Sequence, residues 1–265
     1  MRGIKRNKPR NGVALADKPS GEKKEGFYGF ISTIFYALVI ALVIRTVAYE
    51  PFNIPSESML PTLLVGDYIF VSKFSYGYSR HSVIFSPPLG KGRIFESRPA
   101  RGDVAVFKLP RDNDTDYIKR IIGLPGDRIQ MRRGVLYLNG EAVMRERIDD
   151  YDYVDQAGRH YAVPQYRERL PSGVEYNTFD LQEGGETDDT KVFTVPPEHY
   201  FAMGDNRDNS IDSRVMHGGV GFIPAENLVG RAEFLFFSTD YSAALWELWK
   251  WPQAIRFSRI FRPIE

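Results

Sequence analysis

The 265-residue sequence contains no cysteine. Disulfide bridges, a thiolate nucleophile and metal sites with cysteine ligands are therefore excluded. Histidine is also scarce: four histidines are scattered along the chain, and none belongs to a His-Glu-x-x-His pattern. Because that pattern is typical of helical zinc sites, we expect no metal, and nothing in the sequence indicates a soluble cofactor.

The chain has no excess of charge of one sign. Its 35 lysines and arginines stand against 34 acidic residues, a formal net charge of +1. A nearly neutral chain has no general attraction for phosphate groups, so we expect no nucleic-acid partner. Hydrophobic residues make up 43% of the sequence, which is enough to build a sizeable core.

Long hydrophobic runs are lacking except near the N-terminus, where residues 27–44 read FYGFISTIFYALVIALVI without a charge. Eighteen helical residues rise about 27 Å, close to a hydrocarbon thickness of about 30 Å. We therefore expect one transmembrane helix over residues 27–47. Residues 1–26 are rich in basic side chains, and we expect them to form a disordered tail. Because basic flanks stay on the cytoplasmic side of a membrane, we expect the residues after the helix to lie on the extracytoplasmic side. A cleaved secretory signal is the alternative, but its apolar core is shorter, about 7 to 15 residues.

Beyond this helix the sequence lacks sustained helical periodicity and is typical of a mainly β protein. Short β-branched and aromatic runs predict strands at 66–74, 102–109, 116–123, 127–143, 191–196, 199–205 and 230–238. Asn139-Gly140 within the fourth run predicts a tight hairpin turn. Residues 144–190 are polar and acidic, which indicates an insertion or a flexible cap.

The last segment, residues 241–265, combines aromatic and basic side chains. Its three tryptophans, at 246, 249 and 251, stand beside one lysine and several arginines. Such a mixture suits a lipid headgroup interface. Core packing of the tryptophans with a solvated basic face explains the same pattern, and the sequence does not separate the two.

Ser58 lies in a loop of prolines and small polar residues, PSESMLPTL. A serine in such a loop is commonly a helix cap or a turn residue. It becomes a nucleophile only beside a base, and no Gly-x-Ser-x-Gly elbow occurs in the chain.

Lys119 is a candidate base. Strand alternation in DYIKRIIG places it on the same face as Tyr117, whereas Arg120 points to the other face. Burial lowers the pKa of a lysine, by up to about 3 to 5 units, and thereby makes its amine a base. A lysine at a strand edge with a solvated tip is the ordinary alternative.

A third polar block, MGDNRDNSIDSR, covers residues 203–214. Its density of Asp, Asn, Ser and Arg indicates a fixed polar network. The start resembles a calcium loop, but glycine and a closing glutamate are not at the required positions. An ordinary turn with Asx hydrogen bonds remains the alternative.

Taken in order, the membrane anchor and the three motifs PSESMLPTL, GDVAVFK…DYIKRIIGLPGD and YFAMGDNRDNSIDSR resemble the bacterial type I signal peptidases, or leader peptidases, over about residues 45–235. The resemblance implies a membrane-bound serine endopeptidase that uses a Ser/Lys dyad to remove N-terminal signal peptides from exported preproteins. It implies cleavage after small residues such as alanine. Together with the single apolar helix and its basic flank, we expect a single-pass protein of the bacterial inner membrane with its catalytic domain on the periplasmic side, and from residues 241–265 we expect contact with membrane lipid. Some family members have two spans, so the single span is a departure.

The resemblance also implies residue roles. Ser58 matches the nucleophile and Lys119 the general base; Ser56 matches an oxyanion donor, and Ser210 matches a serine that orients the lysine amine. Arg120 with Asp205, and Asp212 with Arg214, match two supporting ion pairs. The residues that match the lining of two shallow substrate pockets are Phe52, Ile54, Pro55, Met59, Leu63, Tyr117 and Ile118. Glu57 is a departure, because many members have glycine there.

The fold implied is a β-barrel-like catalytic core made of residues 48–132 and 194–240. A smaller β-rich cap, residues 133–193, interrupts it, and residues 241–265 form a segment at the membrane interface. Residues 74–99 are expected to form a loop near the membrane. Three other functions remain open: a specialised Ser/Lys processing peptidase of a conjugative-transfer system, a non-catalytic membrane-tethered binding barrel, and a structural export factor.

Overall fold

The computed structural model describes residues 22–82, 92–154, 159–182, 184–244 and 246–265. Most of the expected N-terminal tail and the middle of the expected loop at 74–99 lie outside these residues. Contact clustering divides the chain into one compact unit up to Leu42 and a second from Val43 to Glu265.

Helix α1 spans Glu22–Val47. Its part from Tyr28 to Val47 has 20 residues and is long and apolar enough to cross a membrane, as the sequence predicts. Large apolar side chains such as Phe30 and Leu38 are more than 60% exposed, which is stable in hydrocarbon but not in water. The helix begins five residues earlier than the expected start at residue 27, because the preceding Glu and Lys residues are good helix formers.

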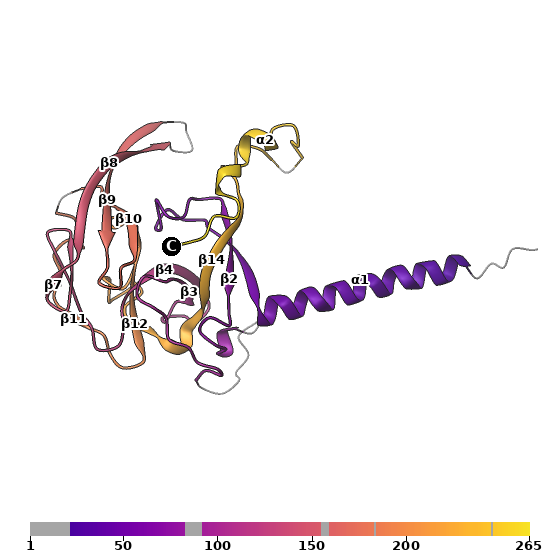
Figure 1. Cartoon of the computed structure of the whole chain (residues 1–265), viewed down its shortest axis with the longest axis horizontal. Helices are drawn as coiled ribbons and strands as arrows, with labels where there is room; N and C mark the ends of the chain where they lie inside the picture. The colour runs from indigo at the N-terminus through magenta and orange to yellow at the C-terminus, as the bar shows by residue number, and fades with distance from the viewer. Residues whose placement is uncertain (1–21, 83–91, 155–158, 183, 245) are drawn as a thin grey trace, which may run out of the picture. The chain divides into compact units, whose positions relative to one another are not determined.

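The second unit is built around a seven-stranded antiparallel sheet (Figure 1). In spatial order its strands are β1 (Tyr49–Asn53), β2 (Asp67–Ser72), β14 (Leu228–Ser238), β3 (Val104–Lys108), β4 (Asp116–Gly123), β12 (His199–Met203) and β13 (Ile223–Pro224). The mainly β architecture predicted from the sequence is confirmed.

Alternating side chains give this sheet its buried face. Ile69 and Val71 of β2 are fully buried and pack in one core cluster with Val104 and Leu235. Gly230 allows β14 to approach β2 closely, since a Cβ there would lie 2.3 Å from the Ser72 carbonyl oxygen.

Two smaller sheets complete this unit. One contains β11 (Phe193–Thr194), β5 (Arg128–Arg132), β6 (Val135–Leu138) and β7 (Glu141–Ala142). The turn between β6 and β7 has positive φ at Asn139 and Gly140, so the hairpin predicted there is confirmed. The expected boundary between the catalytic core and the cap, at residue 133, falls inside this sheet. Residue 133 lies between β5 and β6, and these two strands pair with each other.

The second small sheet contains β10 (Glu175–Phe179), β9 (His160–Arg169) and β8 (Met144–Val154) (Figure 1). Of the two alternatives for residues 144–190, the strands favour a β-rich insertion over a flexible cap, because regular strands cover much of the segment. Strands β8 and β9 are polar and largely exposed. Their sequences therefore show little of the alternation between apolar and polar residues that marks a half-buried strand.

Short helical turns connect or follow these strands: η1 (Arg80–Ser82), η2 (Ala225–Asn227), α2 (Trp251–Ala254) and η3 (Phe257–Arg259). In the C-terminal segment Trp246 and Trp249 are 77% and 71% exposed, so neither packs in the core. Among the long loops are one from Ile54 to Gly66 after β1 and one from Gly204 to Phe222 after β12. They bring the predicted site residues to β4.

Candidate active site

Ser58 lies in the loop between β1 and β2 and is 7% exposed. The backbone of this loop is held by the loop after β12: the Asn206 N–H donates to the Ser58 carbonyl over 3.1 Å, and the Asn206 amide donates to the Glu57 carbonyl over 3.1 Å. A hydroxyl on such a restrained loop has a defined position relative to its neighbours.

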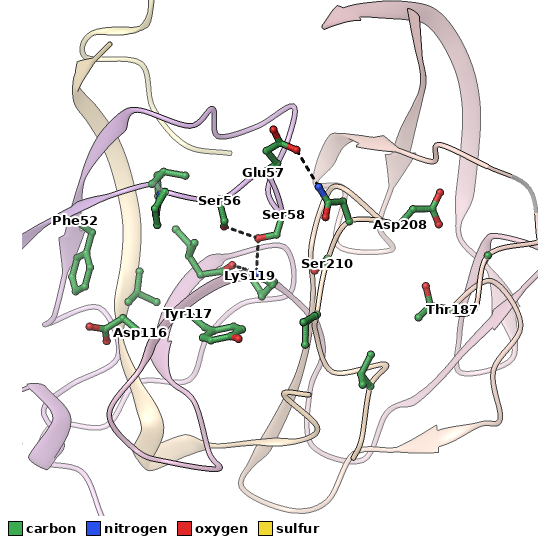
Figure 2. Close-up of a pocket in the computed structure, with 18 of the residues that line it drawn as sticks. Phe52, Ser56, Glu57, Ser58, Asp116, Tyr117, Lys119, Thr187, Asp208 and Ser210 are labelled. Carbon is green, nitrogen blue, oxygen red and sulfur yellow. Dashed lines mark hydrogen bonds between the residues drawn. The ribbon is translucent and has the colours of Figure 1, made fainter. Parts of the chain in front are cut away.

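Lys119 projects from β4 toward that hydroxyl (Figure 2). A hydrogen bond of 2.6 Å joins its Nζ to Ser58 Oγ, and Nζ also donates to the Ile118 carbonyl at 2.8 Å. The side chain is only 3% exposed and lies over the Tyr117 ring, 5.4 Å from its centroid. The interpretation of Lys119 as a strand-edge lysine with a solvated tip is therefore wrong.

Burial lowers the pKa of Lys119 to about 8, against the weaker effect of the Asp212 and Asp205 carboxylates, which raise it. Near neutral pH a useful fraction of the amine is thus unprotonated, whereas a free lysine with a pKa of about 10.4 would be almost fully charged. A neutral amine can accept the proton of the Ser58 hydroxyl.

The two other serines lie close to this pair. Ser56 Oγ is 3.4 Å from Ser58 Oγ (Figure 2). Ser210 Oγ is buried and, within the described part of the chain, has no hydrogen-bond partner. The contact expected between Ser210 and the Lys119 amine is thus not formed. Gly204 allows Ser210 and the Ser58 backbone to lie close together. A Cβ at residue 204 would lie 2.2 Å from Ser210 Oγ and 2.5 Å from the Ser58 carbonyl oxygen.

Both expected ion pairs are present, and both are buried. Arg120 donates two hydrogen bonds to Asp205, at 2.9 and 2.8 Å, and Arg214 donates two to Asp212, at 2.9 and 2.8 Å. Asp212 also accepts the Gly204 N–H at 2.9 Å. The Arg120–Asp205 contact joins β4 to the loop after β12, whereas the Arg214–Asp212 contact and the Gly204 N–H restrain that loop internally.

A cavity of about 920 Å³ opens at the dyad. Five of the seven residues expected to contact substrate line it: Phe52, Ile54, Pro55, Tyr117 and Ile118. Met59 and Leu63 do not; both are fully buried in the core. The reason is a turn of helical type, in which the Leu63 N–H donates to the Met59 carbonyl, so that both side chains point to the same inner face.

The far wall of the cavity was missed by the sequence analysis. It is formed by residues 182, 185–187, 208, 209, 211 and 215. Figure 2 shows Thr187 and Asp208 on the opposite side of the dyad from Phe52 and Asp116. The available signal was the glycine-rich LQEGGETDDT segment, whose glycines allow the chain to approach the site.

Three carboxylates near this wall, those of Asp180, Asp188 and Asp208, lie within 4.8 Å of one another. Protein donors already contact each of them. Arg145 pairs with Asp180, the Gly185 N–H donates to Asp188, and two backbone N–H groups donate to Asp208. We assign no metal to this group.

With the geometry described, comparison with known proteins identifies the family. The family model described as "Signal peptidase, peptidase S26" matches residues 28–237. The chain belongs to this family. A signal peptidase I of Rickettsia canadensis is 42% identical over 244 residues, covering 86% of this chain and 89% of its own. A signal peptidase I of Rickettsia typhi is 41% identical and covers 86% and 90%.

Among solved structures, a signal peptidase I from Enterococcus faecalis V583 is 30% identical. It covers 51% of this chain and 97% of its own, with a TM-score of 0.30.

Proposed function

We propose that this member of the signal peptidase family is a membrane-anchored serine endopeptidase that removes N-terminal signal peptides from preproteins, with Ser58 as nucleophile and Lys119 as general base. The observation that carries the residue assignment is the 2.6 Å contact between Ser58 Oγ and the buried Lys119 Nζ. The relatives named signal peptidase I support the substrate class.

In the first step the neutral Lys119 amine takes the Ser58 proton while Oγ attacks the scissile carbonyl carbon. The resulting oxyanion accepts hydrogen bonds from the Ser58 backbone N–H and the Ser56 hydroxyl. The Lys119 ammonium then gives its proton to the leaving nitrogen, the C–N bond breaks, and an ester of Ser58 remains. Water attacks this ester with Lys119 again as base, which releases the signal peptide as a carboxylic acid and restores the hydroxyl.

The other assigned residues act through position. The buried Arg120–Asp205 pair holds β4 against the loop after β12, and the buried Arg214–Asp212 pair fixes the conformation of that loop. Ser210 Oγ lines the same cavity and is free to accept an N–H of the Lys119 amine. Its proposed role is to orient the amine toward Ser58.

The apolar end of the cavity supports recognition of small side chains, such as alanine, before the scissile bond. Phe52, Tyr117 and Ile118 line that end. The strand β1 lies at the edge of its sheet, so an extended substrate can pair with its backbone while alternate side chains enter the apolar wall.

For location, we propose a single-pass protein of the bacterial inner membrane with the catalytic unit on the extracytoplasmic side. The basic residues before α1 support that direction. The exposed Trp246 and Trp249 beside Lys250 support a lipid contact of the C-terminal segment.

The test is incubation of the purified full chain in detergent with a preprotein, followed by identification of the new N-terminus. We expect cleavage after a small residue, and a loss of at least about 10³-fold in kcat for Ser58→Ala and for Lys119→Ala. The exposed variants Ser172→Ala and Lys191→Ala serve as controls and should keep full activity.

Three results would contradict the proposal. Full activity of either dyad variant would remove the residue assignment. An intact preprotein would favour a binding barrel or an export factor. Cleavage confined to one dedicated substrate would favour a specialised processing peptidase.

A further inference from the structure

Glu57 lies between Ser56 and Ser58 in the sequence, and its side chain points away from their hydroxyls (Figure 2) and takes part in no ion pair among the described residues. Its carboxylate accepts two hydrogen bonds instead. The Tyr153 hydroxyl donates to Oε1 at 2.5 Å and the Asn209 amide donates to Oε2 at 3.1 Å, the latter drawn as a dashed line in Figure 2. One carboxylate therefore joins three separate segments of the chain.

The first segment is the loop from Ile54 to Gly66 that carries Ser58, here called the nucleophile loop. The second is strand β8 of the three-stranded sheet, and the third is the loop after β12. Tyr153 is near the end of β8, far from Glu57 in sequence. Its ring packs against the cluster of Leu60, Val163 and Phe179. Because Leu60 follows Ser58 by two residues, the same strand contacts the nucleophile loop through both a hydrogen bond and apolar packing.

The backbone is restrained at the same point. Asn206 donates to the carbonyls of Glu57 and Ser58, while the Glu57 side chain contacts Tyr153 and Asn209 on the outer side. With both the backbone and the side chain of Glu57 held, the neighbouring Ser58 Oγ has little freedom to leave Lys119 Nζ.

We propose that the hydrogen bond between Tyr153 and Glu57, named the Glu57 latch, is a positioning contact. Through it the sheet of β8, β9 and β10 holds the nucleophile loop over Lys119. Tyr153 is thereby a positioning residue for the reaction, although it does not line the cavity. This inference rests on the proposed function, since it assigns a part of the same dyad to a segment outside the catalytic sheet.

The physical consequence concerns water at the dyad. Burial of the Lys119 amine beneath the loop lowers its pKa and so raises its unprotonated fraction near neutral pH. The charged and titratable groups nearest to it are Asp205 and Asp212 from the loop after β12 and Tyr117 from its own strand. The other titratable groups that line the same cavity are Glu57, Asp116, Glu186 and Asp208. Replacing Tyr153 by Phe changes none of these charges, so any change in the pH dependence of this variant reports loosening of the loop.

The experiment compares the full-length protein with Tyr153→Phe, Glu57→Gln and the double variant, using preprotein cleavage in detergent. We expect each single variant to lower kcat by about tenfold, the loss typical of one hydrogen bond to a charged group, with KM changed less than about twofold. The double variant should be no slower than the slower single variant, because both changes break the same contact. In Tyr153→Phe the alkaline rise of kcat should move to higher pH by about half a unit or more.

Tyr151→Phe is the matched control. It lies on the same strand, packs on Phe179 at 5.1 Å between ring centroids, and should retain the parent kcat, KM and pH profile. Thermal unfolding of each variant is measured alongside, and Tyr153→Phe alone decides the question if Glu57→Gln does not fold.

Parent-like kcat and pH dependence in Tyr153→Phe would overturn the latch, as would additive losses in the double variant or an equal loss in Tyr151→Phe. These failures are distinct from failure of the dyad. Inactive Ser58→Ala beside a parent-like Tyr153→Phe removes only the latch, whereas active Ser58→Ala removes the proposed function itself.

Discussion

At the scale of single residues, Lys119 and its neighbour Arg120 are both buried yet have opposite electrostatic surroundings. Burial lowers the pKa of each side chain, but the charge and hydrogen bonds of Asp205 outweigh it at Arg120 and raise the pKa of that guanidinium. Lys119 has no carboxylate in direct contact among the described residues, so burial prevails and its pKa falls. Neighbouring residues of one strand thus become a permanent cation and a base.

The Arg120–Asp205 pair leads to a stability prediction. Asp205→Asn leaves a buried guanidinium without its counter-charge, so we expect the free energy of unfolding to fall by about 3 to 5 kcal/mol. Urea denaturation measures this change. Asp150→Asn removes the carboxylate of an exposed ion pair with Arg147 and should leave the unfolding midpoint almost unchanged. Equal losses in the two variants would contradict the importance of burial.

The sequence could identify these residues, but it could not establish all of their contacts. Strand alternation correctly separates Lys119 from Arg120, because the period of two is a local property. Whether the Lys119 tip is solvated depends on the loop of Ser58, which lies 61 residues away in sequence. The resemblance to a known family, and not the spacing, suggested that pair. The latch contact between Glu57 and Tyr153 spans 96 residues and left no pattern at all.

At the scale of elements, the loop after β12 approaches the nucleophile loop at Gly204. Gly204→Ala would force a Cβ against the Ser58 carbonyl and Ser210 Oγ. We expect a fall in kcat of at least about 10²-fold, because displacing reacting groups by about 1 Å has this effect. Cleavage kinetics on the folded variant measure it. Gly173→Ala brings no atom within 4 Å of the added Cβ but strains a backbone with a φ of 88°, so it should lower stability while the folded protein keeps its activity. A fully active Gly204→Ala would refute the close approach.

Prediction of elements succeeded where periodicity or turn chemistry is strong. The run at 116–123 coincides with β4, and Asn139-Gly140 forms the expected turn. It did not locate β8 and β9, because these strands expose polar residues and depend on pairing with one another. The substrate contacts that the resemblance implies for Met59 and Leu63 are not seen, because a single helical turn directs both side chains into the core.

At the scale of the whole molecule, the apolar helix and the C-terminal segment each carry exposed apolar side chains. We expect the fragment 48–265 to bind vesicles of phosphatidylethanolamine and phosphatidylglycerol through Trp246 and Trp249. Replacing both by alanine should lower the partition coefficient by about tenfold, because two large aromatic surfaces no longer leave water. Sedimentation with the vesicles measures it.

Met144→Ala is the control for this experiment. Met144 is also an exposed apolar residue, at 66%, but it belongs to strand β8 and not to the C-terminal segment. Its partition should match that of the parent fragment. Unchanged partition of the double tryptophan variant would remove the lipid contact of residues 241–265.

The central claim is that the Lys119 amine loses its proton near neutral pH because it is buried beside Ser58. The most direct measurement is an NMR titration of lysine side chains labelled with ¹³C at Cε, with the Lys119 signal assigned by its absence in Lys119→Ala. We predict a transition near pH 8, with kcat rising through the same pH as the neutral amine accumulates. A transition near the ordinary lysine value of about 10.4 would contradict the account.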